Sequence, residues 1–110
     1  MVAKIDRITA AREIEKSLWD FLHHRNSDAV GIFETDKVDV EVMPTTHLHA
    51  IVCAHAFQGM SMAKRQELVW DHLLKHVSPA SLAHLYAVHT WDPDEYRVYF
   101  QVADEAQTEH

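Results

Sequence analysis

The stretch from His47 to His55 most constrains how this chain can fold. Its residues fall into two alternating sets, and alternation with a period of two is typical of a strand that presents opposite faces in turn. The pattern therefore predicts a strand that belongs to a sheet. One face would carry Leu48, Ala50, Val52 and Ala54, and the other His49, Ile51, Cys53 and His55.

A turn and a helix are predicted to follow this strand. Gly59 marks the turn, and Ser61 is a good N-cap for a helix that reaches about His76. Ser78-Pro79 would end it, because proline cannot continue a helix. The apolar positions predict a buried helix face made of Val69, Trp70, Leu73, Leu74 and Val77.

The remaining chain reads as further helices and strands. Ala10 to His23 has an apolar stripe with helical spacing, formed by Ile14, Leu18, Phe21 and Leu22. Residues 29–34 are strand-like, 37–42 alternate as a half-buried strand does, and 85–91 have strand composition. Residues 96–102 stay open, because strand composition there follows Asp92-Pro93-Asp94-Glu95, which is typical of a helix start.

The order of these elements predicts one α+β domain over residues 10–103. Helices would pack on one face of a short mixed sheet of three to four strands. Residues 1–9 would form an N-terminal extension, and residues 104–110 a flexible acidic tail.

Composition is that of an ordinary soluble globule, with 47% hydrophobic and 25% charged residues in 110. The apolar runs are too short to span a bilayer, and the first residues lack the pattern of a signal peptide. The single cysteine, Cys53, excludes an internal disulfide and is predicted to be a buried small side chain. These features predict a cytoplasmic protein.

The stretch from Phe57-Gln58-Gly59 through Arg65 to His84-Leu85-Tyr86-Ala87-Val88-His89-Thr90 resembles the BolA-like family. The resemblance covers residues 10 to about 96. It implies a class II KH-like fold, in which a helix, a two-strand hairpin, two further helices and a third strand follow one another. It also implies a non-enzymatic role in iron–sulfur trafficking or iron-status regulation.

Members of that family pair with monothiol glutaredoxins around a bridging 2Fe-2S cluster. The resemblance implies that His84, at the start of a strand, is a metal ligand and is partly exposed. His47, which closes the loop before the preceding strand, is the second candidate ligand, although this loop is short and lacks cysteine. A partner surface is implied at Phe57, Gly59, Met60 and Arg65. A homodimer is a further assembly to test.

Two alternatives remain. The first is a transcription regulator that binds DNA through the helix–turn–helix region with Lys64 and Arg65. Net charge is −7, and Gln66 and Glu67 stand where the family usually has histidine and arginine, so nucleic-acid binding is not expected. The second alternative is a protein-binding scaffold without metal.

Histidine is the compositional outlier, with ten in the chain. His72 and His76 are four apart on the predicted helix, a spacing that can hold zinc. No third ligand is local in the sequence, so the pair is interpreted as a surface feature.

Overall fold

The elements occur in the order that the sequence predicts. The computed structural model describes residues 6–26 and 32–108, with side chains through Phe100. Its helices and strands are α1 (Arg7–Arg25), β1 (Lys37–Val42), β2 (Leu48–Cys53), the short 3-10 helix η1 (His55–Phe57), α2 (Met62–His76), α3 (Pro79–Leu82), β3 (Leu85–Trp91) and α4 (Pro93–Thr108).

Within the described residues the strands form one mixed sheet in the order β1-β2-β3. β1 and β2 are antiparallel, with Val38 opposite Val52, whereas β2 and β3 are parallel, with Ala50 opposite Val88. The predicted strands at 37–42 and 85–91 are thus confirmed, and the strand predicted at 47–55 is confirmed over Leu48–Cys53, whereas His55 begins η1. The strand expected at 29–34 is wrong for residues 32–34, which form a bend and a turn. Residues 29–31 lie outside the described residues.

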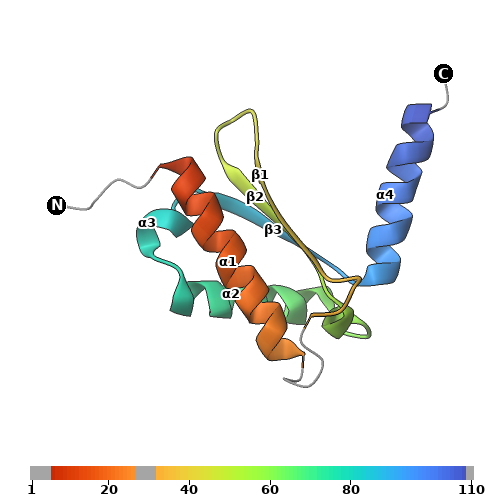
Figure 1. Ribbon diagram of the computed structural model, residues 1–110, viewed down its shortest axis with the longest axis horizontal. Helices are drawn as coiled ribbons and strands as arrows, with labels where there is room; N and C mark the ends of the chain where they lie inside the picture. Colours follow the sequence, from red (N-terminus) through yellow and green to blue (C-terminus); the bar gives the residue numbers. More distant parts are fainter. Residues whose placement is uncertain (1–5, 27–31, 109–110) are drawn as a thin grey trace.

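The core lies between one face of the sheet and the helices α1 and α2 (Figure 1). As the alternation predicts, this core is faced by Leu48, Ala50 and Val52 of β2 and by Ala54 directly after it. Helix α1 contributes its predicted apolar stripe. α2 buries Val69, Leu73 and Val77 as expected, but Leu74 is 69% exposed and its predicted burial is wrong. Leu74 follows Leu73 by one residue, and a step of one residue turns the side chain by more than a quarter of the helix circumference.

Side-chain caps fix the ends of the helices. Ser61 accepts a hydrogen bond from the Lys64 amide, as expected of an N-cap. At α4, the Asp92 side chain accepts from the Glu95 amide and the Glu95 side chain accepts from the Asp92 amide, both at 2.8 Å. This reciprocal capping box decides the open question at residues 96–102 in favour of helix. The helix continues through Thr108, and so includes residues 104–108.

Asp36 joins three segments at one end of the sheet. Its buried carboxylate accepts hydrogen bonds from the Asn26 side chain at 2.9 Å, the Phe33 amide at 3.0 Å and the His55 amide at 2.9 Å. Asn26 ends α1, and His55 begins η1. Asp36 therefore ties the end of α1 to the beginning of β1 and the end of β2.

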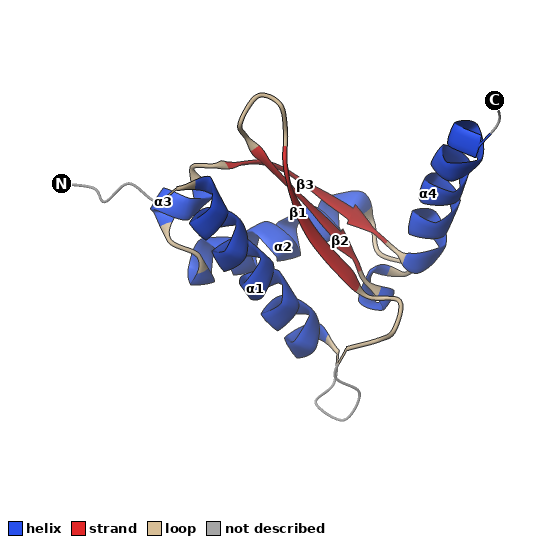
Figure 2. Ribbon diagram, turned by 45° about the horizontal axis from the view of Figure 1, so that its top comes forward, coloured by secondary structure: helices blue, strands red, loops and turns tan. Residues whose placement is uncertain are grey.

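α1, α2 and α3 lie on one side of the sheet, whereas α4 extends from the end of β3 (Figure 2). The Tyr99 ring of α4 stacks on Trp91, with 5.0 Å between ring centroids. Over the described residues, the opposite face of the sheet therefore has only the first part of α4 beside it, and we call it the open face. No helix within the described ranges has both the length and the apolar character needed to cross a membrane.

Candidate functional site

His47 and His84, the two predicted ligands, lie at the same edge of the sheet. Each directly precedes a strand, and these two strands are parallel, with Leu48 opposite Leu85. The Leu48 amide donates to the His84 carbonyl at 2.9 Å, which joins the two segments where the strands begin. The tertiary structure thus brings together two histidines that are far apart in the sequence.

The two histidines differ in exposure. His47 is exposed, and its ring lies 5.6 Å from the ring of Tyr86 between centroids. His84 is half-buried, so the expected partial exposure is confirmed. Beside His47 is an open groove of about 460 Å³, lined by Met43, Pro44, Thr45, His47, His49 and Tyr86.

The loop before His47 is closed by backbone hydrogen bonds. The Met43 amide donates to the His47 carbonyl at 2.9 Å, and the Thr46 amide donates to the Met43 carbonyl at 2.8 Å. Thr46 has φ of 72°, in the left-handed region that a β-branched residue rarely adopts. Backbone strain of this kind is retained where the surrounding hydrogen bonds impose it, here next to a candidate ligand.

Arg65 does not face solvent, which corrects its assignment to phosphate binding and to a partner surface. It is 5% exposed, its Nε donates to the Met60 carbonyl at 3.0 Å, and its Nη1 is paired with Glu95. A second carboxylate, that of Asp92, lies 3.7 Å from Nη2. The guanidinium is therefore occupied by internal acceptors.

The other residues of the predicted surfaces are divided between core and solvent. Phe57 is 1% exposed and is a core residue, so its place on a partner surface is also wrong. Gly59 is exposed, and Met60 is half-buried. Lys64 is exposed and lies 3.9 Å from Glu67 in a solvated pair. Phe57 is buried because the turn through η1 places its ring beneath the Arg65 side chain, with 5.8 Å between the Arg65 Cζ atom and the ring centroid.

Gln66, interpreted from the sequence only as a departure from a family pattern, has a structural role. Its side-chain amide donates to the Val88 carbonyl at 2.8 Å, and its oxygen accepts from the Trp70 indole at 3.2 Å. The bond to Val88 fastens α2 to β3, and the bond from Trp70 lies within α2. Sequence spacing gave no signal for the first, because the Val88 acceptor is a backbone group on a distant strand.

His72 and His76 lie close, with 4.3 Å between ring centroids, but the interpretation of both as surface residues is wrong for His72. His72 is half-buried against α1, and its Nε2 lies 2.9 Å from the Ser17 carbonyl oxygen. Burial is the main cause that lowers the pKa of His72, and the neighbouring His76 acts in the same direction. His76 is exposed.

Cys53 is 1% exposed, which confirms the predicted buried role. Desolvation is the main cause that raises the pKa of its thiol to about 11. The thiolate form is therefore rare at neutral pH, and Cys53 has neither the access nor the ionisation of a reactive cysteine.

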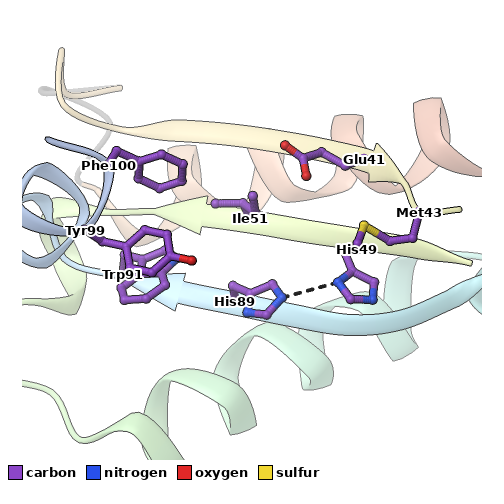
Figure 3. A pocket seen from close by; sticks show the side chains of 8 residues that line it. All are labelled: Glu41, Met43, His49, Ile51, His89, Trp91, Tyr99 and Phe100. Atoms are coloured by element: carbon purple, nitrogen blue, oxygen red, sulfur yellow. Dashed lines mark hydrogen bonds between the residues drawn. The ribbon is translucent and has the colours of Figure 1, made fainter. Parts of the chain in front are cut away.

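The open face carries a second group of histidines that the sequence did not identify as a site. His49 Nδ1 and His89 Nε2 are 3.4 Å apart in a cavity of about 230 Å³ (Figure 3). Its lining residues are Glu41, Met43, His49, Ile51, His89, Trp91, Tyr99 and Phe100. The alternation of the 47–55 strand placed His49 on the face opposite Leu48, but the register of β3 was needed to bring His89 beside it.

Carboxylates of β1 lie on this same side of the sheet. Glu41 is opposite His49 in the sheet register. A hydrogen bond with the Asp39 carboxyl group is the largest cause that raises the pKa of Glu41, followed by partial burial. In the part of the chain that the structure describes, no group of three or more His, Cys, Asp or Glu side chains could hold a metal ion.

Neither a scan against protein-family models nor searches of curated proteins and of solved structures found a match to this chain.

Proposed function

We propose that this protein is a BolA-like, non-enzymatic adaptor that works in the cytoplasm and shares a 2Fe-2S cluster with a monothiol glutaredoxin. The observation that carries the proposal is the position of His47 and His84 at the starts of adjacent parallel strands. The order of elements supports it, because a helix, a hairpin, two further helices and a third strand are what the family resemblance implies.

The donor chemistry fits half of such a site. Imidazole can replace thiolate on one iron of a 2Fe-2S cluster, whereas two irons need four ligands in total. His84 would hold the cluster, with His47 as the second ligand, and the partner and glutathione would supply thiolates. The cluster itself would supply iron–sulfur cargo and one-electron chemistry. The contribution of this chain would be two imidazoles on rigid strand ends.

The burial of Arg65 supports this function over DNA binding through α2. A DNA-binding surface on α2 would need accessible cations, since phosphate contacts supply most of the affinity. Arg65 is buried and paired with carboxylates, and exposed Lys64 is beside Glu67. The geometry therefore favours the adaptor over a regulator that binds DNA through α2.

The test is to mix the untagged protein with a monothiol glutaredoxin, glutathione, iron and sulfide under reducing conditions. We expect a coloured heterodimer on a sizing column. His84→Ala should change its visible absorption and circular dichroism, because loss of an imidazole changes the ligand field of the iron. His47→Ala should change the spectrum as well.

The matched control is His76→Ala, because His76 is an exposed histidine on α2 that lines a hollow with the α1 residues Glu13, Lys16, Ser17 and Asp20. This variant should give the wild-type spectrum. Far-UV circular dichroism of each variant would first verify folding. Identical spectra for His84→Ala and wild type would contradict the ligand assignment, and absence of any coloured heterodimer would contradict the adaptor function and leave a metal-free scaffold.

A further inference from the structure

The strongest further site is the pair of histidines on the open face. His49 lies on β2 and His89 on β3, where His89 is opposite Ile51 in the register. The two rings are therefore diagonal neighbours on adjacent parallel strands. Their nearest nitrogens, His49 Nδ1 and His89 Nε2, are 3.4 Å apart and point toward one another in the cavity (Figure 3).

This separation suits two ligands of one tetrahedral metal ion. Zinc lies 2.0–2.1 Å from an imidazole nitrogen, so two nitrogens of a tetrahedral site are separated by about 3.4 Å. Adjacent ligands of a square-planar ion would be separated by about 2.9 Å. The separation of 3.4 Å, across which the two rings are hydrogen-bonded in the structure, equals the tetrahedral value, so an ion of this geometry would require the rings to turn but not to move apart.

The surroundings of the pair favour a bound cation. Tyr86 stacks on His49 with an interplanar angle of 13°, which restricts the orientation of the imidazole. The carboxyl groups of Asp39 and Glu41 are close enough to one another to interact, and both are on the strand beside His49. Negative charge at this position attracts a divalent ion, and the Met43 side chain lies on the cavity wall.

We propose that His49 and His89 form an exchangeable site for a divalent transition-metal ion of the zinc type. Two imidazoles would hold the ion, and water or a group from a partner would complete its coordination, since two positions remain open. The site uses neither His47 nor His84 as a ligand. It therefore stands or fails independently of the cluster-sharing function.

A second histidine pair provides the natural comparison. His72 and His76 have the spacing of a helical metal site, but His72 Nε2 is engaged with the Ser17 carbonyl oxygen and the ring packs on Phe21. Binding of an ion at that Nε2 would require this contact to break. Among the described residues, the hydrogen bond that an ion would replace at the strand pair is the one between the two imidazoles.

The test is isothermal titration calorimetry, in which Zn²⁺ is added to the untagged, metal-free protein at neutral pH. One equivalent should bind, and His49→Ala or His89→Ala should weaken binding by roughly tenfold or more, because each leaves one imidazole in place of a chelate. The control His72→Ala/His76→Ala and the variant His84→Ala should both retain the wild-type affinity.

Ring-nitrogen NMR of the wild-type protein gives a readout that does not depend on folding of a variant. Zn²⁺ should shift His49 Nδ1 and His89 Nε2 more than the ring nitrogens of His23 or His76. The proposal is overturned if no zinc binds, if both single variants bind as wild type does, or if the His72/His76 control loses the binding. None of these results depends on whether a glutaredoxin heterodimer forms.

Discussion

The Arg65 guanidinium of α2 is ion-paired with the Glu95 carboxylate in the first turn of α4. The same carboxylate accepts a hydrogen bond from the Asp92 amide, so one glutamate both caps α4 and attaches it to α2. The hydrogen bond with that amide is the largest cause that lowers the pKa of Glu95, and the one with Arg65 comes second. The end of β3, where α4 leaves the domain, is thereby fixed to the body of the fold.

Replacement of this arginine should destabilise the protein. Arg65→Met should lower the free energy of unfolding by about 1–3 kcal/mol, because the Met60 carbonyl loses its buried donor and the Glu95 and Asp92 carboxylates lose their ion-pair partner. Chemical denaturation would measure the change. Lys64→Met, one position earlier and exposed, is the control and should change stability little. Equal effects of the two substitutions would contradict the structural role of Arg65.

Glu13 should make the free energy of unfolding depend on pH in the acid range. The Ser78 amide is the largest cause that lowers the pKa of Glu13, and the Ser81 hydroxyl adds to it. Because the folded state holds the proton less tightly than the unfolded state, this stabilisation is complete above the ordinary glutamate pKa. It is lost as pH falls through the lowered, folded-state pKa.

Glu13→Gln should therefore cost about 1 kcal/mol of unfolding free energy at neutral pH. The difference from wild type should shrink as the pH falls below the usual glutamate range. Denaturation curves at a series of pH values would measure it, with Glu15→Gln, an exposed neighbour on α1, as control. A difference that is constant across pH would show that Glu13 is not the titrating group.

His72 should also make the protein less stable as the pH falls, in a higher pH range than Glu13 does. Burial lowers its pKa, so the unfolded state takes up the proton more readily. The contribution of neutral His72 is present above the ordinary histidine pKa and is lost as pH falls through that value toward the lowered one. The unfolding free energy of wild type should therefore decline more steeply over this range than that of His72→Gln.

The control for this prediction is His23→Gln, since His23 is exposed on α1. It should keep the wild-type pH dependence in the same denaturation series. A wild-type slope in His72→Gln as well would mean that other groups cause the decline.

Thr46 offers a stabilising substitution beside the candidate ligand His47. An L-residue in the left-handed region costs roughly 1–2 kcal/mol, and asparagine tolerates this region better than a β-branched residue does. Thr46→Asn should therefore raise the free energy of unfolding by about 1 kcal/mol. Thr45→Asn, with no positive φ, is the control. A loss of stability in Thr46→Asn would contradict the strain at this position.

Periodicity predicted the helices at 10–23 and 61–76, the strands at 37–42, 47–55 and 85–91, and most of the core. These features depend on neighbours within one element, so the local pattern of apolar residues contains them. The exposure of Leu74 shows the limit of that pattern, because an apolar residue at the edge of a helical stripe is buried only if another element covers it.

Capping chemistry was also visible in the sequence, although its meaning at residues 92–95 was left open. The pattern Asp-Pro-Asp-Glu matches a helix start, and reciprocal hydrogen bonds between Asp92 and Glu95 realise it. The residues that follow form a helix in spite of their strand composition, because β-propensity depends on pairing with a neighbouring strand. Over the described residues, β3 is paired with β2 and not with this segment.

The local elements and the alternating faces of β2 could be predicted from the residues alone, because both depend on spacing along the chain. Which distant residues become neighbours follows from the three-dimensional fold: the segments of His47 and His84 where two parallel strands begin, His49 with His89 on the open face, and Arg65 with Glu95 between α2 and α4. Strand order and register set the first two of these distances, and the placement of α2 beside the first turn of α4 sets the third. Register arises from packing of the whole core, which local patterns of residues do not contain.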